Sequence, residues 1–179
     1  MSADDPVSTC APVVIMGVSG VGKSTVGRRL ADALQRPFLD ADDLHPATNV
    51  AKMSAGTPLD DDDRWPWLDL VGDAIRENPR TIVACSALRR AYRDRLRERT
   101  SDLLFLHLTA PAQVLSARLS RRQGHFMAAS MLQSQLDTLE QLVGDENGFT
   151  VAVDAAPATL VNRIHRMLVP LPAEDFHDQ

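Results

Sequence analysis

Residues 17–24 of the chain, Gly-Val-Ser-Gly-Val-Gly-Lys-Ser, have the types and spacing needed to hold a phosphate chain. They fit the pattern G-x-x-x-x-G-K-[ST] at every fixed position, with an apolar run before them and a helical pattern after them. Glycines let the backbone pass close to phosphate oxygens, and successive N–H groups at the positive end of a helix attract anions. Lys23 can reach the β- and γ-phosphates, and the Ser24 hydroxyl can bind Mg²⁺. The sequence therefore predicts a nucleoside triphosphate site, against the alternative of a chance glycine-rich turn.

Other features narrow the kind of nucleotide-binding protein. The chain has no N-K-x-D motif for guanine recognition, and the apolar run that ends at Cys85 is followed by Ser86, not by an acid. These features argue against a GTPase and against a motor-type ATPase. Asp154 does end an apolar run, but that run is the last one in the chain. Asp154 is interpreted either as a strand-end residue near the nucleotide base or as part of a solvated loop.

Two carboxylates follow the second apolar run, at Asp40 and Asp42. If the strand continues through them, both side chains project to one face at its carboxyl end, where open parallel sheets bind ligands. One could hold Mg²⁺ through water, and the other could accept the proton of a substrate hydroxyl. The alternative is that Asp40, Asp42 and Asp43 are turn and N-cap residues.

Charged residues gather in two further places. The run Asp60-Asp-Asp-Asp-Arg64 indicates a helix start that complements the helix dipole, and Arg64 is of interest if the ligand is an anion. Residues 118–126 concentrate cations around Gly124, as a mobile lid over a triphosphate would. The alternative for this segment is a helix end whose arginines complement the dipole before a glycine cap.

The histidines show no metal-ligand spacing. His45 and His125 flank the two segments that could cover a ligand, so a hydrogen bond to substrate is one interpretation of each. His107 alternates within an apolar run and is interpreted as a core or sheet-face residue. Trp65 and Trp67 are expected to anchor a helix rather than stack on a base.

Short apolar runs alternate with helical patterns along the chain. The pattern predicts strands at 13–16, 37–39, 81–85, 103–108 and 150–153, and helices at 23–34, 87–99, 112–122, 131–143 and 159–168. This alternation indicates an α/β fold with a mostly parallel sheet covered by helices on both faces. The polar, proline-containing stretch 44–79 interrupts it and is expected to form helices outside the sheet, as an inserted substrate-binding segment.

Length and composition fit one domain. The 179 residues are 44% hydrophobic and 24% charged, which is typical of a globular protein, and the net charge of −5 does not predict nucleic-acid binding. Cys10 and Cys85 cannot build a disulfide framework, and Cys85 is expected to be buried. No apolar run approaches the ~20 residues that span a bilayer, and residues 1–10 lack a signal-peptide pattern, so we expect a cytoplasmic protein without membrane contact. Residues 1–11 and 170–179 are expected to be flexible tails.

Several strings together resemble the small gluconokinases with a phosphate-binding P-loop. They are residues 16–25, 38–46, 58–68, 85–94, 124–127 and 131–135, and the resemblance extends from about residue 13 to residue 169. The loop is common to many kinases, whereas Asp-Leu-His-Pro at 43–46 and Cys-Ser-Ala-Leu at 85–88 are more specific. The resemblance implies ATP-dependent phosphorylation of D-gluconate to 6-phospho-D-gluconate. It also implies a homodimer and a P-loop fold similar to shikimate and nucleoside monophosphate kinases, with five parallel strands and a lid at 121–130.

The resemblance also implies roles for individual residues, assigned by their matching positions in this chain. The residues implied to bind ATP are Gly17, Val18, Ser19, Gly20, Val21, Gly22, Lys23, Ser24, Thr25 and the lid arginine Arg118. Asp40 and Ser24 are implied for Mg²⁺, and Lys23, Asp42 and the second lid arginine Arg122 for catalysis. Ser86, with Ala87 and Leu88, matches the turn that faces the sugar acid. Arg89 stands where a lysine is expected, which keeps the charge but not the geometry.

The acceptor itself sets requirements for its site. Gluconate needs a cation for its carboxylate and several hydrogen-bonding groups for its hydroxyls. The candidates are Arg64, Lys52, Arg89, Arg90 and His45, and the sequence does not distinguish which of them binds the carboxylate and which bind hydroxyls. A kinase of the same fold for shikimate or another metabolite, and a non-catalytic nucleotide switch, are the alternative functions.

Overall fold

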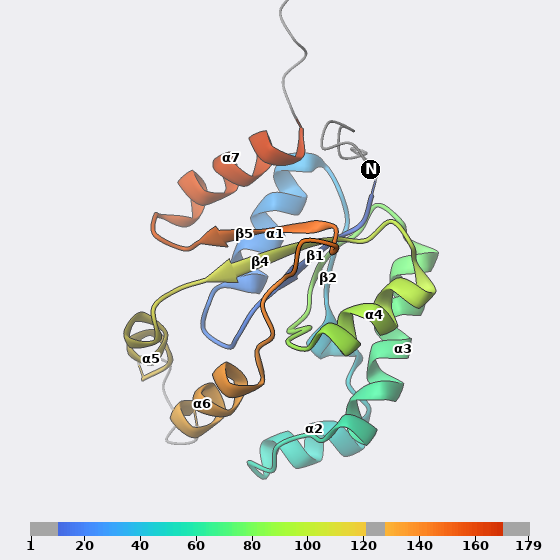
Figure 1. The fold of residues 1–179 in the computed structure, drawn as a ribbon, viewed down its shortest axis with the longest axis vertical. Coiled ribbons are helices and arrows are strands. Elements are labelled where there is room, and N and C mark those ends of the chain that lie inside the picture. Colours follow the sequence, from blue (N-terminus) through green and yellow to red (C-terminus); the bar gives the residue numbers. More distant parts are fainter. Residues whose placement is uncertain (1–10, 121–127, 170–179) are drawn as a thin grey trace, which may run out of the picture.

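The computed structural model describes residues 11–120 and 128–169. Within them, five parallel strands form one sheet in the order β2-β3-β1-β4-β5, and helices cover both of its faces (Figure 1). The strands are β1 (Val13–Met16), β2 (Phe38–Asp40), β3 (Ile82–Ala84), β4 (Leu104–Thr109) and β5 (Gly148–Ala152). The helices are α1 (Lys23–Leu34), the 3₁₀ helix η1 (Ala41–Leu44), α2 (Ala47–Ser54), α3 (Asp61–Glu77), α4 (Arg90–Arg99), α5 (Ala112–Ser120), α6 (Ala128–Thr138) and α7 (Pro157–Leu168). The predicted fold class is confirmed.

The central strands β1, β3 and β4 are buried on both sides because each side packs on helices. In β1, Val13 and Ile15 belong to the core beneath α1 and α7, whereas Val14 and Met16 belong to the core beneath α3 and α4. Successive strand residues point to opposite faces, so a four-residue apolar strand serves two cores at once. The buried Cys85 belongs to the second core, as expected, and burial raises the pKa of its thiol to about 12.

The segment 44–79 forms α2 and α3, with the acid run at the start of α3. Asp60 caps the helix: its carboxylate accepts from the Asp63 amide at 2.9 Å, and the Asp63 carboxylate accepts from the Asp60 amide at 3.1 Å. Trp67, Leu68 and Val71 are buried against the sheet, so α3 is part of the core as well as of the segment that interrupts the alternation. Trp67 anchors the helix, as expected, by donating from Nε1 to the Ala41 carbonyl at 2.7 Å.

Several predicted helix boundaries are wrong: α6 begins at Ala128 and not at 131, α7 begins at Pro157 and not at 159, and two further differences have a structural cause. The helix expected over 87–99 begins at Arg90 because Ala87 has a φ of +41°, outside the helical region. The helix expected to reach 143 ends at Thr138. Beyond it the chain bonds to α4 and the preceding turn, where the Glu140 amide donates to the Leu88 carbonyl at 2.8 Å. Long-range contacts therefore override a local helical pattern there.

In the part of the chain that the structure describes, no helix combines the length and the apolarity needed to cross a membrane.

Candidate active site

The phosphate loop, residues 17–24, connects β1 to α1 at the carboxyl end of the sheet. Its glycines have positive φ at Gly17 (+136°), Gly20 (+82°) and Gly22 (+106°), a region that other residues rarely adopt. A Cβ atom on Gly17 would lie 2.6 Å from the Leu108 carbonyl oxygen, so only glycine fits between the loop and β4. Lys23 begins α1 and donates from Nζ to the Val18 carbonyl at 3.3 Å, which folds its ammonium group back over the loop. This arrangement suits phosphate binding.

A cavity of about 260 Å³ opens beside the loop, and we call it the Asp42 cavity. Five of the residues singled out from the sequence line it: Ser19, Lys23, Asp42, His45 and Arg64, with Ser86 as a sixth. The remaining lining comes from Trp67 of α3, from the end of α2 and the segment after it, and from α6: Met53, Gly56, Thr57, Pro58, Leu59, Ser134 and Gln135. From the sequence, Trp67 is expected only to anchor a helix, and Met53 to Leu59 fall in the predicted substrate-binding segment 44–79 without an individual role. Only the short string at 131–135, noted for its resemblance, pointed to α6.

Asp40 and Asp42 take different positions at the end of β2. Asp40 is the N-cap of η1 and accepts from the Asp42 amide at 3.3 Å, so the N-cap alternative holds for this residue. The side chain of Asp42 is 77% exposed and opens into the cavity. Desolvation by the surrounding residues raises the pKa of Asp42 above its usual value; the Lys23 ammonium opposes this shift, and the negative charges of Asp40 and Asp43 add to it. An acid with a raised pKa beside a phosphate loop is suited to accept a proton.

His45 is held beside Asp42 as a neutral ring. It stacks on Trp67 with a centroid distance of 4.2 Å, and its Nε2 lies 4.0 Å from Asp42 Oδ1. Its Nδ1 lies 3.4 Å from Nδ2 of the buried Asn49, an amide donor, which leaves the proton on Nε2 facing the cavity. Burial lowers the pKa of His45, with Asp42 opposing and Arg64 adding to the shift. His45 can therefore donate a hydrogen bond to a ligand near Asp42.

Arg64 is the only arginine or lysine that lines the Asp42 cavity besides Lys23, within the described residues. Its Nη1 donates to the Tyr92 hydroxyl at 3.2 Å, and that hydroxyl donates to Asp61 Oδ1 at 2.5 Å. The side chain is 27% exposed, and its guanidinium carbon lies 5.6 Å from the Tyr92 ring centre. Tyr92 thus fixes a cation at the cavity wall.

Three other candidate substrate cations lie outside the lining of this cavity, and one of them, Arg90, pairs with Asp145 at 2.6 Å. Lys52 donates to both carboxylate oxygens of Asp63, at 2.6 and 2.7 Å. Arg89 donates to both oxygens of Asp61, at 2.8 and 3.1 Å. Asp61 and Asp63 lie in the first turn of α3 and hold these two cations in ion pairs. Arg122 and His125, the remaining predicted site residues, lie outside the described residues.

Arg118 lies on the opposite side of the loop, between two further cavities. One of about 370 Å³ is lined by Gly20, Gly22, Thr25 and Pro157, and the other of about 610 Å³ by Thr109–Pro111 and Ala152–Ala156. Arg118 lines both cavities and donates to the Val21 carbonyl at 3.4 Å. Asp154 also lines the larger cavity and pairs with Arg163 at 2.9 Å. The loop therefore separates two sets of cavities, as a site that joins a nucleotide to an acceptor requires.

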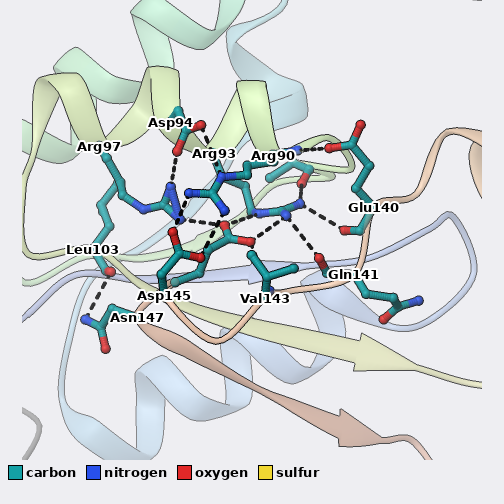
Figure 2. A network of polar contacts seen from close by, with 12 residues as sticks. Arg90, Arg93, Asp94, Arg97, Leu103, Glu140, Gln141, Val143, Asp145 and Asn147 are labelled. Atoms are coloured by element: carbon teal, nitrogen blue, oxygen red, sulfur yellow. Dashed lines mark hydrogen bonds and ion pairs between the residues drawn. The ribbon is translucent and has the colours of Figure 1, made fainter.

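A buried ion pair between Arg93 and Glu146 supports the turn that carries Ser86, and Figure 2 shows Arg93 in the surrounding network of polar contacts. Arg93 and Glu146 are both fully buried and meet through two hydrogen bonds, of 2.6 and 2.8 Å. Arg93 also donates to the carbonyls of Ala87 at 3.2 Å and Glu140 at 3.1 Å, among others. Burial by itself would raise the pKa of Glu146, but hydrogen bonds from Arg93 and from the Val143 amide outweigh it, and the pKa is lowered. Sequence reasoning missed this network, since an arginine in an arginine-rich helix gives no sign of burial.

The same turn touches the phosphate loop. The Ser86 carbonyl accepts from the Gly17 amide at 3.3 Å, and Ala87 directly after it holds its left-handed conformation. The turn is therefore fixed on one side by the loop and on the other by Arg93. The predicted turn residue Ser86 is brought to the cavity by these two supports.

Comparison with known proteins agrees with this geometry. The family model described as shikimate kinase matches residues 19–164. The thermoresistant gluconokinase of Escherichia coli strain K12 is 45% identical over 142 residues, which cover 77% of this chain and 81% of that protein. The crystal structure of a gluconokinase from Sinorhizobium meliloti 1021 has a TM-score of 0.83 and 45% identity, covering 89% of this chain and 92% of that one. A shikimate kinase from Acinetobacter baumannii, solved with shikimate, has a TM-score of 0.59 and 20% identity over 89% of this chain and 93% of that one, so it shows the fold alone. The chain therefore belongs to the gluconokinase family, within the wider group of P-loop kinases that the shikimate kinase model describes.

Proposed function

We propose that this protein transfers the γ-phosphoryl group of ATP to the terminal hydroxyl of D-gluconate, giving 6-phospho-D-gluconate and ADP. The observation that carries the proposal is the Asp42 cavity. It holds an acid, a neutral hydrogen-bond donor and a fixed cation directly beside the phosphate loop. A sugar acid has hydroxyls for the first two groups and a carboxylate for the third. The 45% identity to named gluconokinases supports this acceptor over shikimate.

The acceptor would lie with its carboxylate at Arg64 and its terminal hydroxyl at Asp42. Asp42 accepts the hydroxyl proton as the oxygen attacks the γ-phosphorus, and His45 Nε2–H donates to a hydroxyl oxygen near it. Ser86 contributes a further hydrogen-bonding group at the wall. The cation at Arg64 selects acceptors that carry an anion at the far end from the reacting hydroxyl.

ATP would lie with its phosphates on the loop and its base on the side of Arg118. The residues that would hold it are those of the loop and the start of α1, from Gly17 to Thr25. Lys23, at the start of α1 and on the wall of the Asp42 cavity, would neutralise charge on the β- and γ-phosphates. The predicted lid residues Arg122 and His125 belong to this proposal as groups that reach the reacting end on closure.

A Mg²⁺ ion fits the chemistry of the donors at this end of the sheet. The Ser24 hydroxyl and the Asp40 carboxylate offer the oxygen ligands that Mg²⁺ prefers. In the described residues no three His, Cys, Asp or Glu side chains come together to hold a metal without other ligands, so the ion would depend on nucleotide oxygens and water. When bound, Mg²⁺ supplies charge neutralisation of the phosphate oxygens. A homodimer and a cytoplasmic location stay predictions, and light scattering in solution tests the first.

A coupled ADP-release assay over a panel of acceptors tests the proposed function. We expect D-gluconate to be used with the highest kcat/KM, above shikimate and a nucleoside monophosphate. D-glucitol, which keeps the hydroxyls and lacks the carboxylate, should be poor because it leaves the Arg64 cation without a partner. Chelation of Mg²⁺ should stop turnover. Preference for shikimate, or equal use of gluconate and glucitol, would overturn the assignment.

A further inference from the structure

A side chain of α6 contacts the phosphate loop directly. The Ser19 backbone amide donates to Gln135 Oε1 at 2.6 Å, across 116 residues of sequence. The loop's amides are the groups that bind phosphate oxygens in this type of site. Gln135 therefore accepts a hydrogen bond that a phosphate oxygen could accept.

The contact comes from a helix whose packing fixes its orientation. Leu132 of α6 is 3% exposed and belongs to the core beneath α1 and α7, and Leu136 packs against the same core. These two residues lie on one face of the helix, and Gln135 lies beside that face. Directly after α6, the chain is bonded to Arg93 and to the Leu88 carbonyl, as Figure 2 shows in part. Gln135 is thus held at the loop from both sides.

The position of Ser19 places this contact at the reacting end of the loop. Ser19 and Lys23 line the Asp42 cavity together with Gln135, whereas Gly20, Gly22 and Thr25 line the cavity on the Arg118 side. The Ser19 amide therefore faces the acceptor. In a bound triphosphate, the group nearest to the acceptor is the one to be transferred.

We propose that Gln135 is a ligand of the transferring phosphoryl group, in an inference that rests on the proposed phosphotransfer. When ATP is bound, a phosphoryl oxygen takes the Ser19 N–H away from Gln135 Oε1, and the Gln135 Nε2 group donates to another oxygen of the same phosphoryl group. An uncharged donor here stabilises the charge that this group carries in transfer without pairing with Asp42. ADP lacks the group and would leave Gln135 on the Ser19 amide.

The first test compares kcat of Gln135→Glu and Gln135→Ala with that of wild type. Glutamate keeps the shape and can still accept from the Ser19 amide, but it has no N–H₂ and carries a negative charge. We expect kcat to fall about 100-fold or more for Gln135→Glu and at least about 10-fold for Gln135→Ala. The KM for gluconate should change by less than about threefold if the contact is made to the phosphoryl group. Gln133→Glu, two residues earlier on the exposed face and bonded to Asp137 at 2.8 Å, is the matched control and should keep wild-type kcat.

The second test measures nucleotide binding without acceptor, using a non-hydrolysable ATP analogue and ADP. In Gln135→Glu, the affinity for the analogue should fall at least about tenfold relative to that for ADP, because the carboxylate keeps the Ser19 N–H and repels the last phosphate. In Gln135→Ala, the affinity for ADP should equal that of wild type. Equal losses for both nucleotides together with a lower melting temperature would indicate a structural role and overturn the inference.

The two tests separate this inference from the proposed function. If wild type does not phosphorylate gluconate, the proposed function fails, while the difference between ATP analogue and ADP still decides the role of Gln135. If gluconate is used and Gln135→Glu keeps more than a third of wild-type kcat, the inference fails and the function stands. A variant whose loss lies in the KM for gluconate, with kcat kept, would make Gln135 an acceptor ligand and would also overturn it.

Discussion

The phosphate loop and the Asp42 cavity adjoin each other and are built in opposite ways. The loop is one continuous run of residues whose backbone adopts positive φ at three glycines and whose amides would bind the phosphates in the proposed function. The cavity is built from residues of the loop, η1 and the residue after it, α2 and the segment after it, α3, the turn after β3 and α6. A ligand held by backbone is recognised through general features of phosphate, whereas a ligand held by dispersed side chains can be recognised in detail. This division suits an enzyme with a common donor and a particular acceptor.

The difference also concerns what each region tolerates. A methyl group on Gly17 would meet the Leu108 carbonyl at 2.6 Å, so the loop is limited by sterics. The cavity is limited by polar positioning: Arg64 depends on Tyr92 and Asp61, and His45 depends on Trp67 and Asn49. Asp42, His45 and Arg64, which lie in the cavity but outside the loop, can therefore be tested without changing a loop residue.

The largest effect is expected where the two regions meet, at Lys23. Lys23→Ala removes the ammonium group from the reacting phosphates, and we expect kcat/KM to fall about 1,000-fold or more. The coupled assay with gluconate measures this. Lys52→Ala is the matched control, because Lys52 is paired with Asp63 and does not line the cavity. Loss of less than tenfold at Lys23, or equal losses in both variants, would contradict the loop assignment.

A substitution at Asp42 should separate the two regions, because it should slow the chemical step in the cavity and leave nucleotide binding at the loop intact. Asp42→Asn removes the base, and we expect kcat to fall about 100-fold or more while ATP affinity changes little. Because the pKa of Asp42 is raised in the folded protein, its charged form is disfavoured there. Its contribution to stability is present below the pKa of the unfolded chain and is lost as the pH rises through the folded value.

At pH 7, therefore, Asp42→Asn should fold at least as stably as wild type. Thermal melting checks this. Asp43→Asn, at an exposed neighbouring residue, is the control and should keep the wild-type kcat. In wild type, kcat should fall on the acid side with an apparent pKa above the usual range of an aspartate. An apparent pKa within that range would show that Asp42 is not the group that titrates.

A substitution at Arg64 tests whether the cavity binds the negative charge of the acceptor. Arg64→Gln should raise the KM for gluconate by about 10- to 100-fold, since a charge-assisted hydrogen bond contributes about 1.5–3 kcal/mol and 1.4 kcal/mol is a factor of ten. With D-glucitol, the variant and wild type should behave alike, because neither has a carboxylate to bind. Arg76→Gln, near the end of the same helix, is the control and should leave KM unchanged. A similar penalty with both acceptors would show that Arg64 supports the wall and does not bind the carboxylate.

The sequence predicts the backbone-built region more fully than the side-chain-built one. Gly17–Ser24 could be placed because a local motif carries its own geometry, and β1 and α1 match their predicted bounds. Asp42, His45 and Arg64 could be named as candidates, but not set apart from Lys52 and Arg89, because ion pairs with Asp63 and Asp61 decide which cations remain at the cavity. Gln135 and Arg93 could not be assigned, since their partners lie about 116 and 53 residues away along the chain. Side-chain sites depend on such distant pairings, which local periodicity does not contain.

The smallest effect is expected for a substitution at His107, which distinguishes loss of activity at acid pH from loss of folding stability at acid pH. It is 1% exposed on β4, on the side of the sheet that holds Phe105, and neither ring nitrogen finds a hydrogen-bond partner among the described residues. Burial, with the nearby Arg93 charge, lowers its pKa from 6.5 to about 4.

Because the pKa of His107 is lower in the folded protein, the unfolded chain binds more protons between these two values, and folding stability falls as the pH drops through this window. The loss from pH 6.5 to about pH 5.5 is about 1 kcal/mol. His107→Leu should remove that slope in chemical unfolding curves while keeping the acid limb of kcat that Asp42 sets. If His107→Leu shifted the kcat limb as well, the acid limb would report the core and not the proton acceptor in the cavity.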